Sequence, residues 1–125
     1  KAIDYYKKAI ALKPEEYPAN FNVGLLYYNQ AVQYGKEIGV LSSSQTDQKK
    51  ADSLAAKQNG FLDAAFPYLE KTYQLLDAKD KLDPNELSAY KSTLTGLKSI
   101  YARKNQTDKY NEADAKLKSA DGKAK

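Results

Sequence analysis

The chain has 125 residues, the length of one domain, and a formal net charge of +4 at pH 7. It contains no cysteine and no histidine, which excludes disulfides, thiolate metal sites, a cysteine nucleophile and a histidine base. Its 20 basic residues include one arginine, Arg103, and the lysines are mixed with acids, so we expect a solvated surface and no nucleic-acid partner. The apolar runs are short, so no membrane insertion is expected.

The first expected helix covers residues 2–12. It ends before Pro14, because the residue that precedes a proline avoids helical backbone angles. Ala2, Tyr6 and Ala9 lie on one face of this helix, at steps of four and three residues.

The second expected helix runs from about residue 18 to residue 37. Gly24 lowers its helix propensity by about 1 kcal/mol, so we expect it where two helices approach closely. The predicted buried stripe is Gly24, Tyr27, Tyr28, Ala31, Tyr34 and Ile38. A loop follows over 39–47, in which Ser44 and Asp47 form a predicted capping pair.

The third expected helix starts near Thr46 and follows one long apolar face. Asn59-Gly60 could form a turn, but the apolar phase continues across it, so a continuous helix is favoured. Pro67 cannot donate a backbone hydrogen bond, and we expect a kink there. The residues on this face are Ala51, Leu54, Ala55, Gln58, Phe61, Leu62, Ala65, Leu69, Thr72 and Tyr73.

Two shorter helices are expected at the C-terminal end. Asp83-Pro84-Asn85-Glu86 is a strong helix start, and the helix runs to about residue 104. Thr107 is the expected cap of a short polar helix, and residues 120–125 are expected to fray. The predicted buried residues of the two helices are Leu87, Tyr90, Leu94, Leu97, Tyr101, Tyr110, Ala113 and Leu117. The predicted fold class is therefore all-α.

Two segments resemble the tetratricopeptide repeat (TPR) family. Ala2, Tyr6, Ala9 and Pro14 are similar to the A-x3-F…P pattern of a second repeat helix, and Val23-Gly24 with Tyr27 to the L-G-x2-Y pattern of a first helix. The spacing of Ala2, Tyr6 and Ala9 recurs at Ala65, Leu69 and Thr72, and Asp77 then stands in the place of Pro14. Those two residues are 63 apart, whereas a standard repeat has ~34, so about 29 residues are inserted near 34–60.

The resemblance divides the single domain 1–125 into four parts: the second half of a repeat (1–16), a repeat with the insertion (17–79), a degenerate capping repeat (84–119) and the tail (120–125). The chain opens inside a repeat and has no methionine, which is typical of a C-terminal fragment of a longer array. A preceding helix would then pack on the face around Ile3 and Ile10. The insertion and the Lys/Asn/Tyr-rich composition resemble TPR proteins of the Gram-negative cell envelope, which favours a bacterial periplasm or envelope location.

The TPR resemblance implies a non-catalytic scaffold that binds a peptide or protein segment in a concave groove. First helices line such grooves, which implies a role for Thr95, Ser99 and Ala102 in the fourth expected helix. The candidate groove residues are Phe21, Asn22, Leu25, Tyr28, Asn29, Val32 and Arg103. The eleven tyrosines are predicted to serve mainly in packing.

Two other functions are alternatives to this one. The first is a structural or self-association element, in which Tyr34, Ile38, Val40 and Leu41 offer apolar surface for a homo-oligomer. The second is an enzyme built on paired carboxylates, such as Asp63 with Glu70 or Asp80 with Asp83. These pairs have no histidine, cysteine or glycine-rich partner, and surface ion pairing explains them better. No catalytic residue, metal or cofactor is therefore expected.

Overall fold

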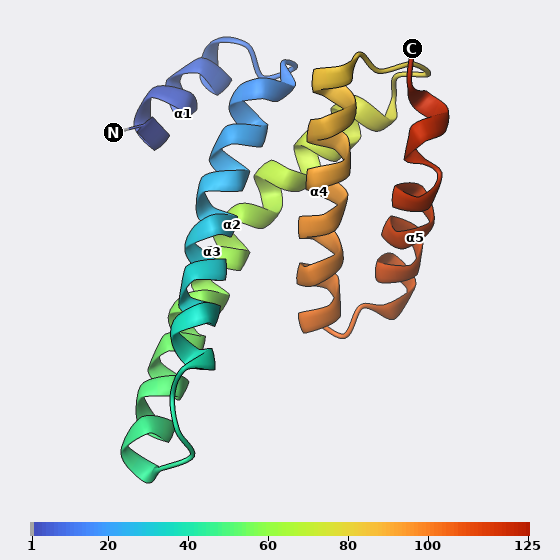
Figure 1. Cartoon of the computed structure of the whole chain (residues 1–125). Coiled ribbons are helices and arrows are strands. Elements are labelled where there is room, and N and C mark those ends of the chain that lie inside the picture. Colours follow the sequence, from blue (N-terminus) through green and yellow to red (C-terminus); the bar gives the residue numbers. More distant parts are fainter. Residues whose placement is uncertain (1) are drawn as a thin grey trace.

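The computed structural model describes residues 2–125, and this part of the chain is all-α (Figure 1). The helices are α1 (Ala2–Leu12), α2 (Tyr17–Gly39), α3 (Gln45–Asp77), α4 (Pro84–Arg103) and α5 (Thr107–Lys118), followed by the 3-10 turn η1 (Ala120–Lys123). The predicted fold class is confirmed, and each helix boundary that the sequence predicts lies within two residues of the observed one.

Each helix contacts the next one along the chain, and α2 also contacts α4. The long α2/α3 hairpin projects well beyond α1, α4 and α5 in Figure 1. The chain between Tyr34 and Gly60 forms the outer parts of both arms of this hairpin and the loop between them. No helix among residues 2–125 combines the length and the apolar character needed to cross a membrane.

Local signals set the ends of the two central helices. The Ser44 hydroxyl accepts a hydrogen bond from the Asp47 amide at 3.2 Å, which confirms the predicted capping pair of α3. Asp83 and Glu86 form a reciprocal capping box at the start of α4, with N–H···O distances of 2.8 and 3.0 Å.

α3 is one continuous helix, as predicted from the unbroken apolar phase across Asn59-Gly60. Pro67 lies inside it. In Figure 1 the helix runs beside α2 and then turns toward α4 in its second half, which contains the proline.

The core lies where α3 and α4 meet, because α4 turns most of its apolar residues inward. Tyr90, Leu94, Leu97 and Ile100 of α4 are each 1% exposed, and Leu69 of α3 is 2% exposed. Tyrosines pack as predicted. Tyr73 stacks on Tyr90 at this core, and between α2 and α3 Tyr34 stacks on Phe61 and Tyr27 lies against Tyr68.

The C-terminal end corrects one expectation. Residues 120–125 do not fray, because the Leu82 amide donates to the Lys123 carbonyl at 2.7 Å and the Lys125 amide donates to the Leu82 carbonyl at 3.2 Å. Ala120 is 1% exposed. The segment between α3 and α4 therefore holds the chain end in place.

The cap of α5 is also corrected. Thr107 is the first residue of the helix and not its cap; Gln106 stands at the capping position, and its side chain makes no capping hydrogen bond.

The exposed apolar side chains of α1 and of the hairpin also differ from those that were predicted. Ile3 and Ile10 are half-buried against the protein, and the exposed apolar side chains of α1 are Tyr5 and Leu12. In the hairpin, α3 covers most of the expected apolar surface. Tyr34, Ile38 and Leu41 are half-buried, and only Val40 of that set is exposed.

Candidate functional site

The candidate site is a hollow of about 360 Å³ where the α2/α3 hairpin separates from α4. We call it the junction hollow. Its walls combine apolar side chains with amide, hydroxyl and guanidinium groups from three helices. The lining residues are Tyr28, Ala31 and Val32 of α2, Gln58 and Leu62 of α3, and Ser99, Ala102 and Arg103 of α4.

Hydrogen bonds between helices fix the polar side chains of the hollow. The Tyr28 hydroxyl donates to Ser99 Oγ at 3.0 Å, which joins α2 to α4. Gln58 Nε2 donates to the Ala31 carbonyl at 3.1 Å, which joins α3 to α2. These bonds leave each polar group in one orientation, so the wall is preformed.

Gly35 makes the approach of Gln58 possible. A Cβ atom added at Gly35 would lie 2.8 Å from Gln58 Nε2, which is closer than such contacts allow. The sequence therefore keeps a glycine opposite the amide that lines the hollow.

Arg103 sits at the α3 edge of the hollow. Its Nε and Nη2 atoms donate to Asn59 Oδ1 at 3.2 and 2.8 Å. Since a guanidinium carries five N–H donors, these two bonds use only part of its capacity. The side chain is thus held in place while it still presents donors and a positive charge.

The structure brings three of the predicted groove residues together, namely Tyr28, Val32 and Arg103. Ser99 and Ala102, which were predicted with them, also line the hollow. Val32 is 39% exposed, so an apolar wall of the hollow is open to a partner.

The other four predicted groove residues lie elsewhere, which corrects the prediction of one continuous groove. Phe21 packs against the hydrophobic core, and Asn22 faces a different hollow beside α1. Leu25 is half-buried and Asn29 is exposed, and neither lines the junction hollow. The physical reason is that each step along a helix turns about 100°, so neighbours such as Phe21 and Asn22 face different partners.

Sequence reasoning missed the contribution of α3. Gln58 stood out as a polar residue in an otherwise apolar stripe, and that was the available signal. Leu62 belongs to the same stripe but carries no polar signal, and it is 6% exposed.

Among the hollows outside this site are two with separate linings. One, of about 370 Å³, lies between α1 and the start of α2, and we call it the α1 hollow. It is lined by Tyr5, Tyr6, Ala9, Leu12, Lys13, Glu16, Pro18, Ala19 and Asn22. The other is a smaller cavity of about 130 Å³ between α3, α4 and α5, which we call the α5 cavity.

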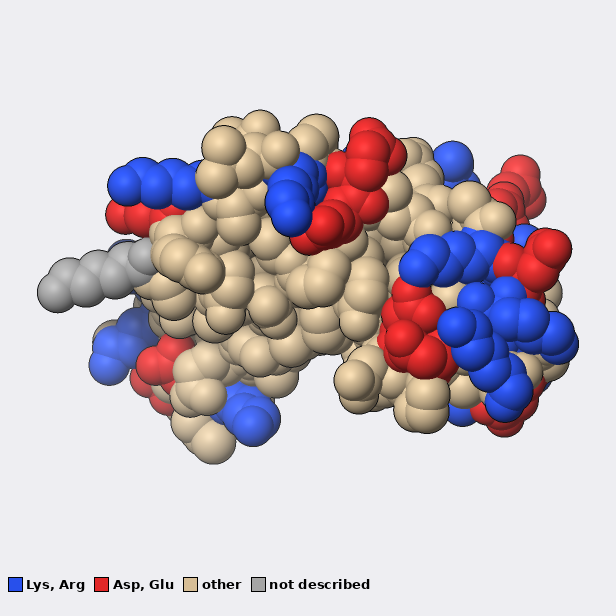
Figure 2. Space-filling view, turned by 90° about the horizontal axis from the view of Figure 1, so that it is seen from above, with Lys and Arg blue, Asp and Glu red and all other residues tan. Residues whose placement is uncertain are grey.

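Charges are mixed over the surface. On the face shown in Figure 2, positive and negative side chains lie side by side. The ion pairs of the protein include Lys71–Glu15 (3.5 Å) and Lys13–Glu16 (3.7 Å). One carboxylate of each pair considered as catalytic has a structural partner. Asp63 pairs with Lys104 at 3.4 Å, and Asp83 caps α4.

Within residues 2–125, no group of three or more aspartate or glutamate side chains is arranged to hold a metal ion. Comparisons with protein-family models, with curated proteins and with solved structures find no match for this chain.

Proposed function

We propose that the chain is a non-catalytic protein-interaction module that binds a peptide or protein segment at the junction hollow. The observation that carries the proposal is Val32, which is 39% exposed in a hollow whose polar groups are already oriented by hydrogen bonds. An apolar anchor of a partner could bury Val32 and Ala102, while Arg103 meets a carbonyl or carboxylate group beside it.

The TPR resemblance supports the same surface. It implies that first helices line the concave face, and the two helices that would be first helices, α2 and α4, both contribute to the hollow. The stacking of the helical hairpins as a short TPR-like solenoid is part of this proposal.

The test is a selection from a random-peptide display library against the wild-type chain, followed by affinity measurements on two variants. Val32→Asp places a carboxylate in the apolar wall of the hollow and is expected to weaken the selected peptides at least tenfold. Val40→Asp is the matched control, because Val40 is 84% exposed at the far end of the hairpin and should not alter binding. Peptides that bind Val32→Asp as tightly as the wild type would show that the hollow is not the site.

Phe21→Ala and Tyr28→Ala are unsuitable as binding variants. Both side chains pack against the hydrophobic core, and Tyr28 also bonds Ser99. A loss of binding by these variants would therefore report on packing as well as on contact with a partner.

A second candidate function, self-association, is favoured by a separate observation on α1. Tyr5 and Leu12 are 70% and 83% exposed beside the α1 hollow, and the helix contains no buried residue. Light scattering over a concentration series tests it. A concentration-dependent dimer that Leu12→Asp abolishes and Val40→Asp retains would support self-association through α1, and a monomer at the highest concentration would exclude it.

A further inference from the structure

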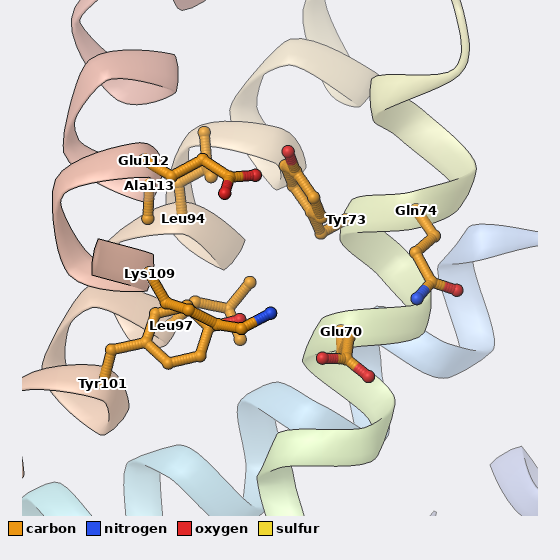
Figure 3. Close-up of a pocket in the computed structure, with 9 residues that line it drawn as sticks. All are labelled: Glu70, Tyr73, Gln74, Leu94, Leu97, Tyr101, Lys109, Glu112 and Ala113. Carbon is orange, nitrogen blue, oxygen red and sulfur yellow. The ribbon is translucent and has the colours of Figure 1, made fainter. Parts of the chain in front are cut away.

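The α5 cavity has an apolar floor, aromatic walls and a charged rim (Figure 3). Leu94, Leu97 and Tyr101 come from α4, and the cavity is closed on its two sides by α3 and α5. The remaining lining residues are Glu70, Tyr73 and Gln74 of α3, and Lys109, Glu112 and Ala113 of α5. This cavity shares no residue with the junction hollow.

The hydroxyl group of a largely buried tyrosine faces this cavity without a partner among residues 2–125. Tyr101 is 8% exposed, and its hydroxyl makes no hydrogen bond to any of residues 2–125. Tyr90, in the same helix, shows the usual arrangement, because its hydroxyl donates to Asp77 Oδ1 at 2.6 Å. The Tyr101 oxygen is not fully enclosed by the protein, so it is open to the cavity and available to a polar group from outside.

Two carboxylates approach the cavity from opposite sides, Glu70 from α3 and Glu112 from α5. Burial raises the pKa of Tyr101, and the charges of Glu70 and Glu112 raise it further. The hydroxyl therefore keeps its proton at neutral pH, and it can both donate and accept a hydrogen bond.

Lys109 is the one cation among the residues that line the cavity, and Figure 3 shows its side chain extending from α5 toward α3. It forms no ion pair within 4.0 Å among residues 2–125, and neither do Glu70 and Glu112. Two carboxylates and one ammonium leave the rim with an excess negative charge. Lys109 thus places one ammonium group at the rim, but it pairs with neither Glu70 nor Glu112 and leaves their charge in excess.

We infer that the α5 cavity binds a small organic cation, a primary ammonium group on a short apolar chain. The ammonium group lies between Glu70 and Glu112, within reach of the Tyr101 hydroxyl, and the chain lies over Leu97 between the tyrosine rings. Tyrosine faces attract cations, and the apolar floor accepts methylene groups. The volume of about 130 Å³ corresponds to roughly four water molecules, which suits a chain of a few carbons.

The experiment is a titration of the full chain followed by amide chemical shifts in NMR, with three probes of equal length at constant ionic strength. Butylammonium carries the positive charge, 1-butanol is neutral, and butyrate is negative. Butylammonium is expected to bind at least fivefold more tightly than 1-butanol, with shift changes around Leu97, Tyr101 and Ala113. Equal affinities of the two probes, preferential binding of butyrate, or shift changes confined to other residues would overturn the inference.

Two variants of exposed rim residues sharpen the test without disturbing the core. Glu112→Gln is expected to weaken butylammonium binding at least threefold, because it removes one of the two negative charges. Lys109→Met removes the competing internal ammonium group and is expected to tighten binding. Glu37→Gln, an exposed residue of α2, is the control and should leave the affinity unchanged. An unchanged affinity in Glu112→Gln, or a weaker affinity in Lys109→Met, would contradict the proposed position of the cation.

Discussion

The side chain of Leu69 in α3 lies directly over Gly24 in α2. A Cβ atom added at Gly24 would lie 2.8 Å from Leu69 Cδ2 and 3.3 Å from the Leu69 amide nitrogen. The same leucine faces Gly96 of α4, where an added Cβ atom would lie 3.1 Å from Leu69 Cδ1. One buried side chain therefore fills the space that two glycines on two other helices leave open.

Gly24→Ala is expected to destabilise the fold by about 1 to 2 kcal/mol. Overpacking costs about 1 to 3 kcal/mol, and the better helix propensity of alanine recovers at most about 1 kcal/mol of it. Leu69 cannot move away easily, because part of the contact is with its backbone. Urea unfolding measures the change.

The control for this variant is Gly60→Ala in α3. A Cβ atom added at Gly60 meets no atom of residues 2–125 within 4 Å, so only the propensity term acts. We expect a gain of up to about 1 kcal/mol. Equal stability of Gly24→Ala and Gly60→Ala would contradict the close contact between α2 and α3 at Gly24.

Thr93 in α4 is fully buried, and its hydroxyl has no hydrogen-bond partner among residues 2–125. Thr93→Val replaces this hydroxyl with a methyl group of similar shape. Because an unpaired buried hydroxyl costs about 1 to 3 kcal/mol, the variant is expected to be at least as stable as the wild type and up to about 1 kcal/mol more stable. Thermal unfolding at neutral pH measures the difference.

Thr72→Val is the matched comparison for Thr93→Val. Thr72 is equally buried, but its hydroxyl donates to the Tyr68 carbonyl at 2.8 Å. Loss of this bond is expected to cost about 1 kcal/mol. A larger loss in Thr93→Val than in Thr72→Val would mean that the Thr93 hydroxyl has a partner after all.

The hydrogen bond from Tyr90 to Asp77 links stability to both acid and alkaline pH. Burial would raise the pKa of Asp77, but bonds from Tyr90 and Lys116 outweigh burial and leave the pKa below its ordinary value of 3.8. This contribution is therefore present above about pH 4 and is lost as the pH falls through the lowered pKa. Burial and the bond to Asp77 raise the pKa of Tyr90, so its contribution is present below pH 10 and is lost above it.

Tyr90→Phe should therefore make the free energy of unfolding less dependent on pH, in both the acid and the alkaline range. The free energy of unfolding is measured by urea titration from pH 2 to pH 5 and above pH 9. Some alkaline loss should remain in the variant, because burial raises the pKa of the neighbouring Tyr73 to about 12. Tyr5→Phe, at a side chain that is 70% exposed, serves as the control. A profile for Tyr90→Phe that parallels the wild type at both ends would refute the linkage.

The elements of this fold could be predicted because their signals are local. Pro14, the Ser44 cap and the Asp83–Glu86 capping box act within a few residues of the chain, and the structure uses each of them at a helix end. The continuity of α3 was predictable for a related reason. An apolar face that keeps its phase across Asn59-Gly60 can be buried only by an unbroken helix.

The candidate site was predictable only in part, because it depends on which way each helix faces. The spacing of Tyr28 and Val32 identifies one face of α2, but it does not say that Phe21 turns toward the core or that Asn22 turns toward α1. Gln58 contributes from a distant segment, and its bond to the Ala31 carbonyl joins residues 27 positions apart. Such contacts follow from tertiary packing, which local patterns do not contain.

The docking of the chain end on Leu82 could not be predicted for the same reason. Leu82 is fully buried, and both its backbone N–H and its carbonyl bond to residues 123 and 125. Lys123 Nζ also donates to the Asp77 carbonyl at 3.0 Å. A polar segment such as DGKAK carries no apolar signal, so its sequence is typical of a free tail even though its backbone is paired.

Deletion of residues 120–125 is expected to lower the free energy of unfolding by about 2 to 4 kcal/mol. Two backbone hydrogen bonds contribute about 1 kcal/mol each, and the rest comes from the exposure of Leu82. Hydrogen exchange of the Leu82 amide gives the direct measurement, since its acceptor is removed and exchange should become fast. Gly122→Ala is the control, because an added Cβ atom there meets no atom of residues 2–125 within 4 Å. Unchanged stability and slow exchange at Leu82 in the shortened chain would show that residues 120–125 are a free tail. Removal of a docked segment must expose the Leu82 N–H and carbonyl groups, which it holds in hydrogen bonds.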